Sequence, residues 1–361
     1  MKKFLSLALA LAMTAALLVG CGAKTDAPAK EETTPTTKEE TQKPDDTQKA
    51  EEPVNVIEFS IATNATPGTV SDQAGEKLTQ LLNDSGLFKV TYYNNSQLGS
   101  ISDCFESILA GDYVMTLGGG SDWGDVVGEP NLGASMTPFL LDELDEIYGL
   151  TESDLWKGMI ANAEKNVNVK IFNYPEISGS RYFLTPEPVV TPADMSGMLV
   201  RVPTSSYYVN AIKAFGGTPV SIPVGDLYTS LAQKMVDAAE FTYAATFTRQ
   251  LYEVVGYMAN NAYVTTFDFW GISTELWNAL SDEQKTVLDD AVKQATELTF
   301  EVFPTLEAES KQKLIDAGMV FYDMDAQSFR DCMGTFYDLC EWTDEFKTEL
   351  NAAMEAYRAA N

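Results

Sequence analysis

Residues 176–203 read EISGSRYFLTPEPVVTPADMSGMLVRVP, and the organisation of the chain is clearest from this stretch outward. It holds two of the chain's five arginines, Arg181 and Arg201. Arg201 lies in the apolar run 199–203, which is typical of a buried strand. A buried guanidinium is costly unless it meets an anion, and its planar fork matches a carboxylate. The anion is either one of the 53 Asp and Glu residues, as a structural ion pair, or the carboxylate of a ligand.

Short segments in and around this stretch resemble one protein family. TPADMSGMLVRVP at 191–203 is similar to the "tPeDlkGlkiRvp" segment of DctP-type solute-binding proteins, which serve tripartite ATP-independent periplasmic (TRAP) transporters. The resemblance extends in order from about 54 to 350, through QLG at 97–99, PFL at 138–140, GSR at 179–181, FGGTP at 215–219, DLY at 226–228 and VDAAE at 236–240.

The resemblance implies an α/β fold. We expect a two-lobed, periplasmic-binding-protein-like fold with mixed sheets and a long helix linking the lobes. One lobe would comprise 54–178 with 267–306, and the other 179–266 with 307–361. The lobes would close over a ligand bound between them.

The resemblance also implies site residues. In this family the arginine of the "iRvp" segment, here Arg201, clamps the ligand's carboxylate, and Arg181 matches an arginine that assists it in some members. Asn64 matches a first-lobe residue that often faces ligand. Many members carry Glu-Asn where this chain has Glu240 and Phe241. Because phenylalanine cannot hydrogen-bond a carboxylate, we expect a monocarboxylate with an apolar or aromatic body, and not a sugar acid or a short dicarboxylate, unless Phe241 merely repacks the pocket wall.

Several other residues near these motifs have two readings each. Trp270 is a candidate wall residue, and Trp123, after the glycines at 118–120, either stacks on the ligand or packs in the core. Asp237 and Glu240 could form an acid pair for hydrolysis, but in a helix-end turn they would support the site instead. Asp268, beside Trp270, could bind a cation or a ligand amine.

Composition excludes several classes of protein. A net charge of −29 disfavours binding to nucleic acid or to anionic lipid, and an anionic ligand then needs a local positive site. The chain has no histidine, so His-dependent catalysis and His metal sites are excluded. We therefore expect a binding protein without enzymatic activity, cofactor or metal. The thiols of Cys104, Cys332 and Cys340 are expected to be free and buried.

The N-terminus predicts export. Lys2 and Lys3 precede an apolar run, and residues 1–20 are typical of a signal peptide. The ending LVGC at 18–21 resembles a bacterial lipobox, which implies cleavage before Cys21 and its lipidation; the alternative is a plain signal peptide with an incidental cysteine. Residues 22–53 contain no aromatic or large aliphatic side chain and so cannot form a core. Residues 21–53 are therefore expected to be a lipidated cysteine followed by a disordered tether.

Hydrophobic periodicity predicts the order of elements. Strands at 54–62, 88–93 and 113–117, separated by two helices, indicate a parallel sheet with ligand expected at its carboxyl end, where Asn64 and a loop at 118–123 fall. Later elements are expected as helices at 138–149, 153–165, 226–235 and 247–257, strands at 169–174, 220–223 and 267–273, a long helix starting with the capping box at 281–284, and further helices within 325–360.

These observations predict a lipid-anchored, extracytoplasmic protein that captures a small organic carboxylate and delivers it to a TRAP permease in the membrane. The alternative is a ligand-sensing lipoprotein that signals to a membrane receptor.

Overall fold

The computed structural model describes residues 55–361. The predicted signal peptide, Cys21 and the tether lie outside these residues. Within the described part of the chain, no helix is both long and apolar enough to cross a membrane.

The first strands form the predicted parallel sheet. β1 (Ile57–Ala62) lies between β2 (Phe88–Tyr93) and β3 (Val114–Gly119) and pairs with both in parallel. The crossover helices are α1 (Val70–Asp84) and α2 (Ile101–Leu109). Apolar side chains of this sheet and of the helices over it form one of the two hydrophobic cores. The β-α-β-α-β order predicted from periodicity is therefore confirmed.

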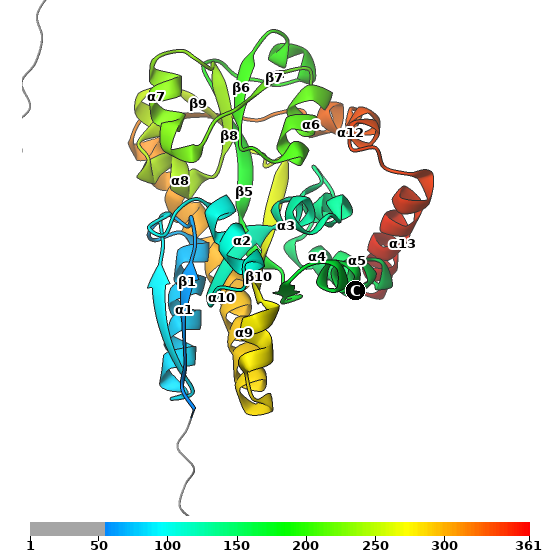
Figure 1. Cartoon of the computed structure of the whole chain (residues 1–361). Helices are drawn as coiled ribbons and strands as arrows, with labels where there is room; N and C mark the ends of the chain where they lie inside the picture. The colour runs from blue at the N-terminus through cyan, green and yellow to red at the C-terminus, as the bar shows by residue number, and fades with distance from the viewer. Residues whose placement is uncertain (1–54) are drawn as a thin grey trace, which may run out of the picture. The chain divides into compact units, whose positions relative to one another are not determined.

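Two long antiparallel strands continue this sheet (Figure 1). β10 (Val264–Ser273) pairs with β3 and with β5 (Glu176–Thr185), and the short β4 (Val169–Ile171) also pairs with β10. The β5–β10 register changes between Thr266 and Phe267, so that β5 contains one extra residue there. We call β1, β2, β3 and β4 the first strand group; β5 and β10 connect it with the strands described next.

The second strand group lies on the far side of β5. β8 (Ala238–Phe241) pairs antiparallel with β5, and β6 (Leu199–Val202) pairs in parallel with β8 and with β7 (Thr218–Ser221). β9 (Tyr257–Ala259) also pairs with β5, and with β11 (Val320–Tyr322). Parallel and antiparallel pairs occur together, which confirms the expected mixed α/β fold.

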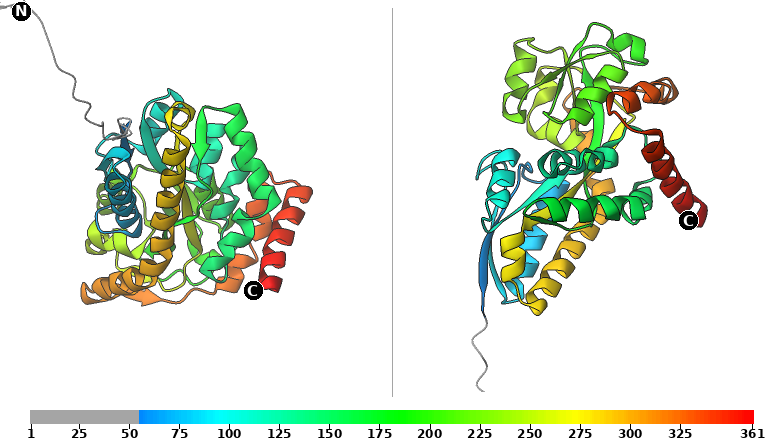
Figure 2. Two further views of the ribbon diagram at one scale, coloured as in Figure 1. Left: turned by 90° about the horizontal axis from the view of Figure 1, so that it is seen from below. Right: turned by 45° about the vertical axis from the view of Figure 1, so that its right-hand side comes forward.

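Helix α10 (Asp282–Asp316) is the long helix expected from the sequence. Ser281 and Gln284 form the predicted capping box at its start. The helix packs against α1, against β5 and against α8 (Tyr243–Thr248), so it contacts elements beside both strand groups. Figures 1 and 2 show it running alongside them.

The C-terminal helices pack on both strand groups' helices. After α11 (Ala326–Arg330), α12 (Met333–Leu339) packs on α6 (Ser206–Ala214). α13 (Asp344–Ala360) then lies against α4 (Ile147–Thr151) and α5 (Asp154–Asn166), as Figure 1 shows. Helices were predicted within 325–360, and these confirm it.

Two predicted helices are wrong. In 138–149, the chain is irregular until a 3-10 turn at Leu144–Glu146, and Phe139 has a positive φ of 57° that no helix accommodates. In 247–257, α8 ends at Thr248, Gln250 has a φ of 56°, and the chain enters β9. In both segments a residue with left-handed backbone interrupts the helix that the spacing of hydrophobic residues predicts.

The loop predicted at 118–123 is also wrong at its glycines, because residues 118–120 belong to a strand and a helix. Gly118 and Gly119 end β3, and Gly120 starts α3 (Gly120–Val127). A Cβ on Gly120 would lie 2.2 Å from the carbonyl oxygen of Leu132. Glycine is required here by close backbone packing rather than by a turn.

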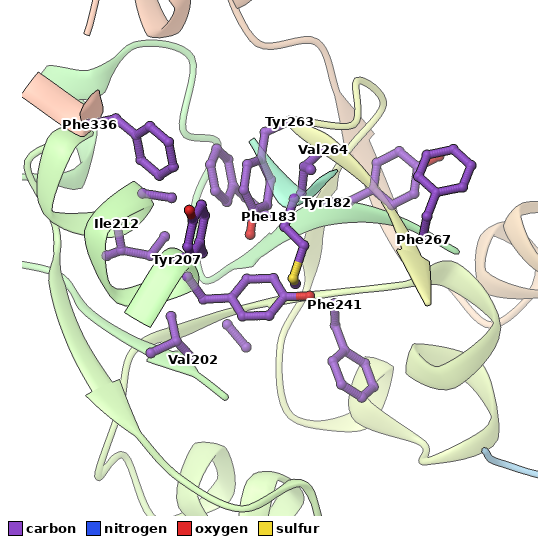
Figure 3. Close-up of a cluster of buried hydrophobic side chains, with 14 of the residues drawn as sticks. Tyr182, Phe183, Val202, Tyr207, Ile212, Phe241, Tyr263, Val264, Phe267 and Phe336 are labelled. Atoms are coloured by element: carbon purple, nitrogen blue, oxygen red, sulfur yellow. The ribbon is translucent and has the colours of Figure 1, made fainter. Parts of the chain in front are cut away.

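The second, larger core covers the second strand group and the surrounding helices. Figure 3 shows part of it, in which the rings of Phe183 and Tyr263 lie face to face with their centroids 4.9 Å apart. The three described cysteines are free, as predicted, but only Cys104 is buried; Cys332 and Cys340 are partly exposed.

Candidate ligand-binding site

Arg201 is buried without a carboxylate partner. It lies in β6, is 2% exposed, and donates one hydrogen bond from Nε to the carbonyl oxygen of Ile222 at 2.9 Å. Its Nη1 is buried and has no hydrogen-bond partner. No ion pair within residues 55–361 includes Arg201. A structural ion pair, one of the two readings of the sequence, is therefore not what this structure shows.

Of the two arginines, Arg181 is the one that forms an ion pair with a carboxylate of the protein. It lies in β5, and its Nη1 is 3.3 Å from Oε2 of Glu240, a fully buried residue of β8. The hydroxyl of Tyr263 donates to the same Oε2 at 3.3 Å. The guanidinium lies over the ring of Tyr208 at 4.9 Å. Glu240 is thus a strand residue that fixes Arg181, and not part of the helix-end turn expected from the sequence.

Phe241 lies next to both cations. Its ring centroid is 5.9 Å from the guanidinium carbon of Arg181 and 5.9 Å from that of Arg201. Its side chain is 5% exposed, and its role as a wall of the site stays a prediction. The aromatic ring offers the guanidinia a cation–π contact but no hydrogen-bond acceptor in their plane.

Burial and neighbouring charges shift the pKa values of Arg181, Arg201 and Glu240 in different directions. Burial lowers the pKa of Arg201 to about 10, with the nearby Glu240 opposing that effect. For Arg181, burial also disfavours the charge, but Glu240 outweighs it and the pKa is raised. Burial raises the pKa of Glu240, which both arginines counteract. Two guanidinia share one carboxylate, so this buried cluster carries surplus positive charge and favours an anion.

Two acidic residues, Asp122 and Asp268, lie near Arg181. The sequence did not single out Asp122, and it indicated Asp268 only as a possible partner for a cation or an amine. Asp122 lies in the first turn of α3 and Asp268 in β10; burial raises the pKa of both carboxyl groups, and the charge of Arg181 opposes that rise. Asp122 carried no signal beyond its place after the glycines. Asp268 could be placed only once the register of β10 was known.

Hydrogen bonds join residues from the helices of the two strand groups. Ser121 Oγ, at the start of α3, is 2.7 Å from Ser205 Oγ, just before α6, and both residues are buried. The Tyr207 hydroxyl donates to the carbonyl oxygen of Pro130 at 3.2 Å. Arg249 Nη2 donates to Thr66 Oγ1 at 3.0 Å. The site is therefore enclosed by direct contacts between these segments.

Trp123 and Trp270 both lie in the hydrophobic cores, which for Trp123 is the packing alternative given above. Trp123 is 1% exposed and its Nε1 donates to the Phe269 carbonyl oxygen at 2.8 Å. Trp270 is fully buried and its Nε1 donates to Oε2 of Glu176 at 2.6 Å. Both indole N–H groups are therefore bound by acceptors of the protein itself, and contact of either ring with a ligand stays a prediction.

The ligand-facing role expected of Asn64 stays a prediction. Asn64 lies two residues beyond β1 and is exposed. Among residues 55–361, no hydrogen bond joins it to either arginine. Asp237, the other member of the supposed acid pair, accepts a hydrogen bond from the Leu199 amide at 2.8 Å and so holds β6.

Comparison with known proteins places this arrangement in a family. Residues 61–342 match the family model DctP, described as bacterial extracellular solute-binding protein, family 7. The sialic acid-binding periplasmic protein SiaP of Vibrio cholerae is 24% identical over 77% of this chain and 87% of its own. The 2,3-diketo-L-gulonate-binding periplasmic protein YiaO of Escherichia coli is 24% identical over 72% of this chain and 80% of its own.

Solved structures share the fold. A TRAP periplasmic solute-binding protein of Actinobacillus succinogenes with bound L-galactonate has a TM-score of 0.76 and 24% identity, covering 83% of this chain and 99% of its own. One from Fusobacterium with bound sn-glycerol-3-phosphate has a TM-score of 0.78 and 24% identity, covering 84% of this chain and 99% of its own. The chain belongs to the DctP family of bacterial extracellular solute-binding proteins, and it is a binding protein rather than an enzyme.

Proposed function

We propose that this protein captures a small organic carboxylate between two lobes and delivers it to a TRAP permease in the membrane. The observation that carries this proposal is the buried, unpartnered Nη1 of Arg201. A desolvated guanidinium nitrogen without an acceptor costs free energy, and a carboxylate supplies the missing acceptor in bidentate geometry. Arg181 also has a buried Nε without a partner, but it is paired with Glu240, whereas no ion pair within residues 55–361 includes Arg201; we therefore assign the ligand's carboxylate to Arg201.

The first strand group and its helices would be one lobe, with 54–178 and 267–306, and the second would be the other, with 179–266 and 307–361. β5 and β10 would then be the hinge strands. The ligand contacts both lobes, so it stabilises the closed arrangement relative to an open one. Relatives described as binding sialic acid and 2,3-diketo-L-gulonate support an organic acid as the ligand class.

The lipobox-like segment supports a lipid anchor on Cys21, which would hold the protein at the outer surface of the cell membrane. Metabolic labelling with a fatty-acid analogue tests this. Label on the wild-type protein and none on Cys21→Ser is the expected result, and equal labelling of both proteins would contradict the anchor.

Binding calorimetry on purified protein tests the capture function. Replacing Arg201 by alanine should weaken carboxylate binding by about 10²–10³-fold, since it removes a charge-assisted pair in a closed site. Arg201→Lys should recover only part of the affinity, because an ammonium cannot bind both carboxylate oxygens in the plane of a fork. Retention of wild-type affinity by Arg201→Ala would refute the function.

A matched control is Arg358→Ala. Arg358 lies on helix α13, and its Nη2 is 2.7 Å from Oε2 of Glu146, so its ion pair is separate from the two arginines of the site. It should leave the affinity for the carboxylate unchanged.

A further inference from the structure

We infer that the ligand carries a cationic amine as well as a carboxylate, because Asp122 and Asp268 form an acidic end in the same site. This inference rests on the proposed function, since it assumes that Arg201 holds the carboxylate. It names the class of ligand: an amino-carboxylate zwitterion, rather than a simple acid or a dicarboxylate.

The two acidic side chains meet over one glycine. Asp268 in β10 is the register partner of Gly119 in β3. A Cβ on Gly119 would lie 3.3 Å from Asp122 Oδ2 and 3.4 Å from Asp268 Oδ1. Both side chains keep part of their surface exposed, whereas the core residues around them do not. The carboxyl groups therefore converge at the edge of accessible space.

The extra residue in β5 places Arg181 beside these acids. Asp268 pairs with Glu176, Thr266 with Gly179 and Val264 with Arg181, so Ser178 is the residue without a counterpart. Directly paired residues point to the same face of a sheet, and a bulge shifts that alternation by one. Arg181 consequently shares a face with Glu176 and Asp268, which an unbroken strand would not allow.

Glu176 adds an independent sign of a missing donor. It is fully buried, and its Oε2 accepts from Trp270 Nε1 at 2.6 Å. Its Oε1 is also buried and has no hydrogen-bond partner within the described residues. Asp268 is its register partner, and after burial the charge of Asp268 is the next cause that raises the pKa of Glu176, so the unmet acceptor lies close to the acidic end. A buried carboxylate oxygen without a donor is costly, and an ammonium with three N–H donors is suited to relieve that cost.

The balance of charge leads to the same class of ligand. Among residues 55–361, Arg181 is the cation whose charge acts on Asp122 and Asp268, none acts on Glu176, and Arg181 is already paired with Glu240. A ligand with a carboxylate alone satisfies Arg201 and leaves these acids without positive charge. A second carboxylate on the ligand would be repelled by them. Within residues 55–361, no group of three acidic or cysteine side chains is arranged to hold a metal ion.

The protonation of the acids supports the geometry and yields a measurable signature. Burial raises the pKa of Asp122 to about 6 and that of Asp268 to about 7, where Asp122 adds to the effect; Asp125 adds to it at Asp122, and Arg181 lowers both. A bound ammonium favours the ionised carboxylates and lowers both pKa values. Binding an amino acid near pH 6.5 therefore releases protons, and affinity rises with pH over the range in which the acids ionise.

The test is calorimetry with ω-amino carboxylates from β-alanine to 6-aminohexanoate and with L-α-amino acids, each matched to the carboxylate that lacks the amine. At pH 7.5 the best amine-bearing ligand should bind at least about 10-fold more tightly than its matched acid. Titrations in two buffers of different ionisation enthalpy should show proton release. Asp122→Asn and Asp268→Asn should each remove most of the preference, and Asp84→Asn, at the exposed end of α1, should keep it.

The outcomes separate this inference from the proposed function. If no amine-bearing ligand binds more tightly than its matched acid, or if both Asp→Asn proteins keep the full preference, the inference is overturned. Carboxylate binding that Arg201→Ala abolishes would still support the capture function in that case. Binding that survives Arg201→Ala would refute the function itself.

Discussion

At the scale of single residues, the two arginines of the site have different roles. Arg181 is held by Glu240 and Tyr208 and contributes its charge through a fixed network. Arg201 has one hydrogen bond to a backbone carbonyl oxygen and, within residues 55–361, no carboxylate partner; its buried Nη1, like the Nε of Arg181, has no hydrogen-bond partner there. The ligand-free protein therefore bears the cost of desolvating Arg201, and a bound carboxylate offsets that cost.

This difference predicts that replacing Arg201 by an apolar residue stabilises the ligand-free protein and abolishes carboxylate binding. Arg201→Met keeps most of the side chain's volume and removes the buried charge. We expect the free energy of unfolding of the ligand-free protein to rise by about 1–3 kcal/mol, because buried charges without full pairing are often replaced favourably by apolar groups. Carboxylate binding should be lost in the same protein. Chemical denaturation measures the first effect, and a clearly less stable Arg201→Met protein would show that Arg201 has structural partners.

Asp268 predicts how the stability of the ligand-free protein depends on pH. Its pKa of about 7 is above the ordinary value near 4, so the folded state binds more protons than the unfolded state between these pH values. Stability should therefore fall as pH rises from about 4 to 7, in part because of this group. Asp268→Asn should flatten that fall by on the order of 1–2 kcal/mol, discounted because the carboxyl is partly exposed. Denaturation curves at pH 4.5 and 7.5 measure the difference, and identical slopes in both proteins would contradict it.

At the scale of elements, glycines and one bulge fix where the site residues point. A Cβ on Gly271 of β10 would lie 2.3 Å from the ring of Trp123, so glycine lets this indole lie flat on the strand. Trp123 in turn holds α3, from which Asp122 reaches the site. The packing of a core tryptophan thus positions an acid of the proposed binding site.

Gly271→Ala should destabilise the protein by about 1–3 kcal/mol, because the methyl group forces the Trp123 ring to move. Gly158→Ala on α5 is the matched control, since Gly158 is exposed and has open space around it. That control should be neutral or slightly stabilising, as alanine favours a helix interior over glycine. Thermal unfolding compares the two, and equal melting temperatures would contradict the account of Gly271.

The sequence predicted elements well where periodicity was regular and poorly where backbone conformation intervened. The parallel sheet, the capping box at Ser281 and the long helix followed from hydrophobic spacing and local side-chain chemistry. Phe139 and Gln250 break expected helices through positive φ values, which neither residue type signals. For the site, the motif identified both arginines, but only the register and the bulge place Asp268 and Glu176 on the same face of the sheet as Arg181.

At the scale of the whole described region, contacts between the two strand groups' helices enclose the site. Ser121 with Ser205 and Tyr207 with Pro130 connect α3 and the segment after it to α6. If these segments belong to separate lobes, ligand can enter only when such contacts break. Exchange of ligand and relative motion of the lobes are then the same event.

A disulfide across this contact tests that coupling. The Ser121 and Ser205 hydroxyls are 2.7 Å apart, which is close enough for cysteines at both positions to be bridged. The oxidised Ser121→Cys, Ser205→Cys protein should fail to bind ligand added afterwards, and it should release ligand bound beforehand at least about 10-fold more slowly. Reduction should restore exchange, and each single cysteine protein should behave as wild type. Unchanged exchange in the oxidised form would show that these segments do not gate the site.

The most direct test of the account is a crystal structure of the protein with its ligand bound. We predict the ligand's carboxylate within hydrogen-bonding distance of Arg201 Nη1, at about 2.7–2.9 Å, with Glu240 still paired to Arg181. An Arg201 guanidinium bound to a carboxylate of the protein itself, with the ligand held elsewhere, would contradict the central claim.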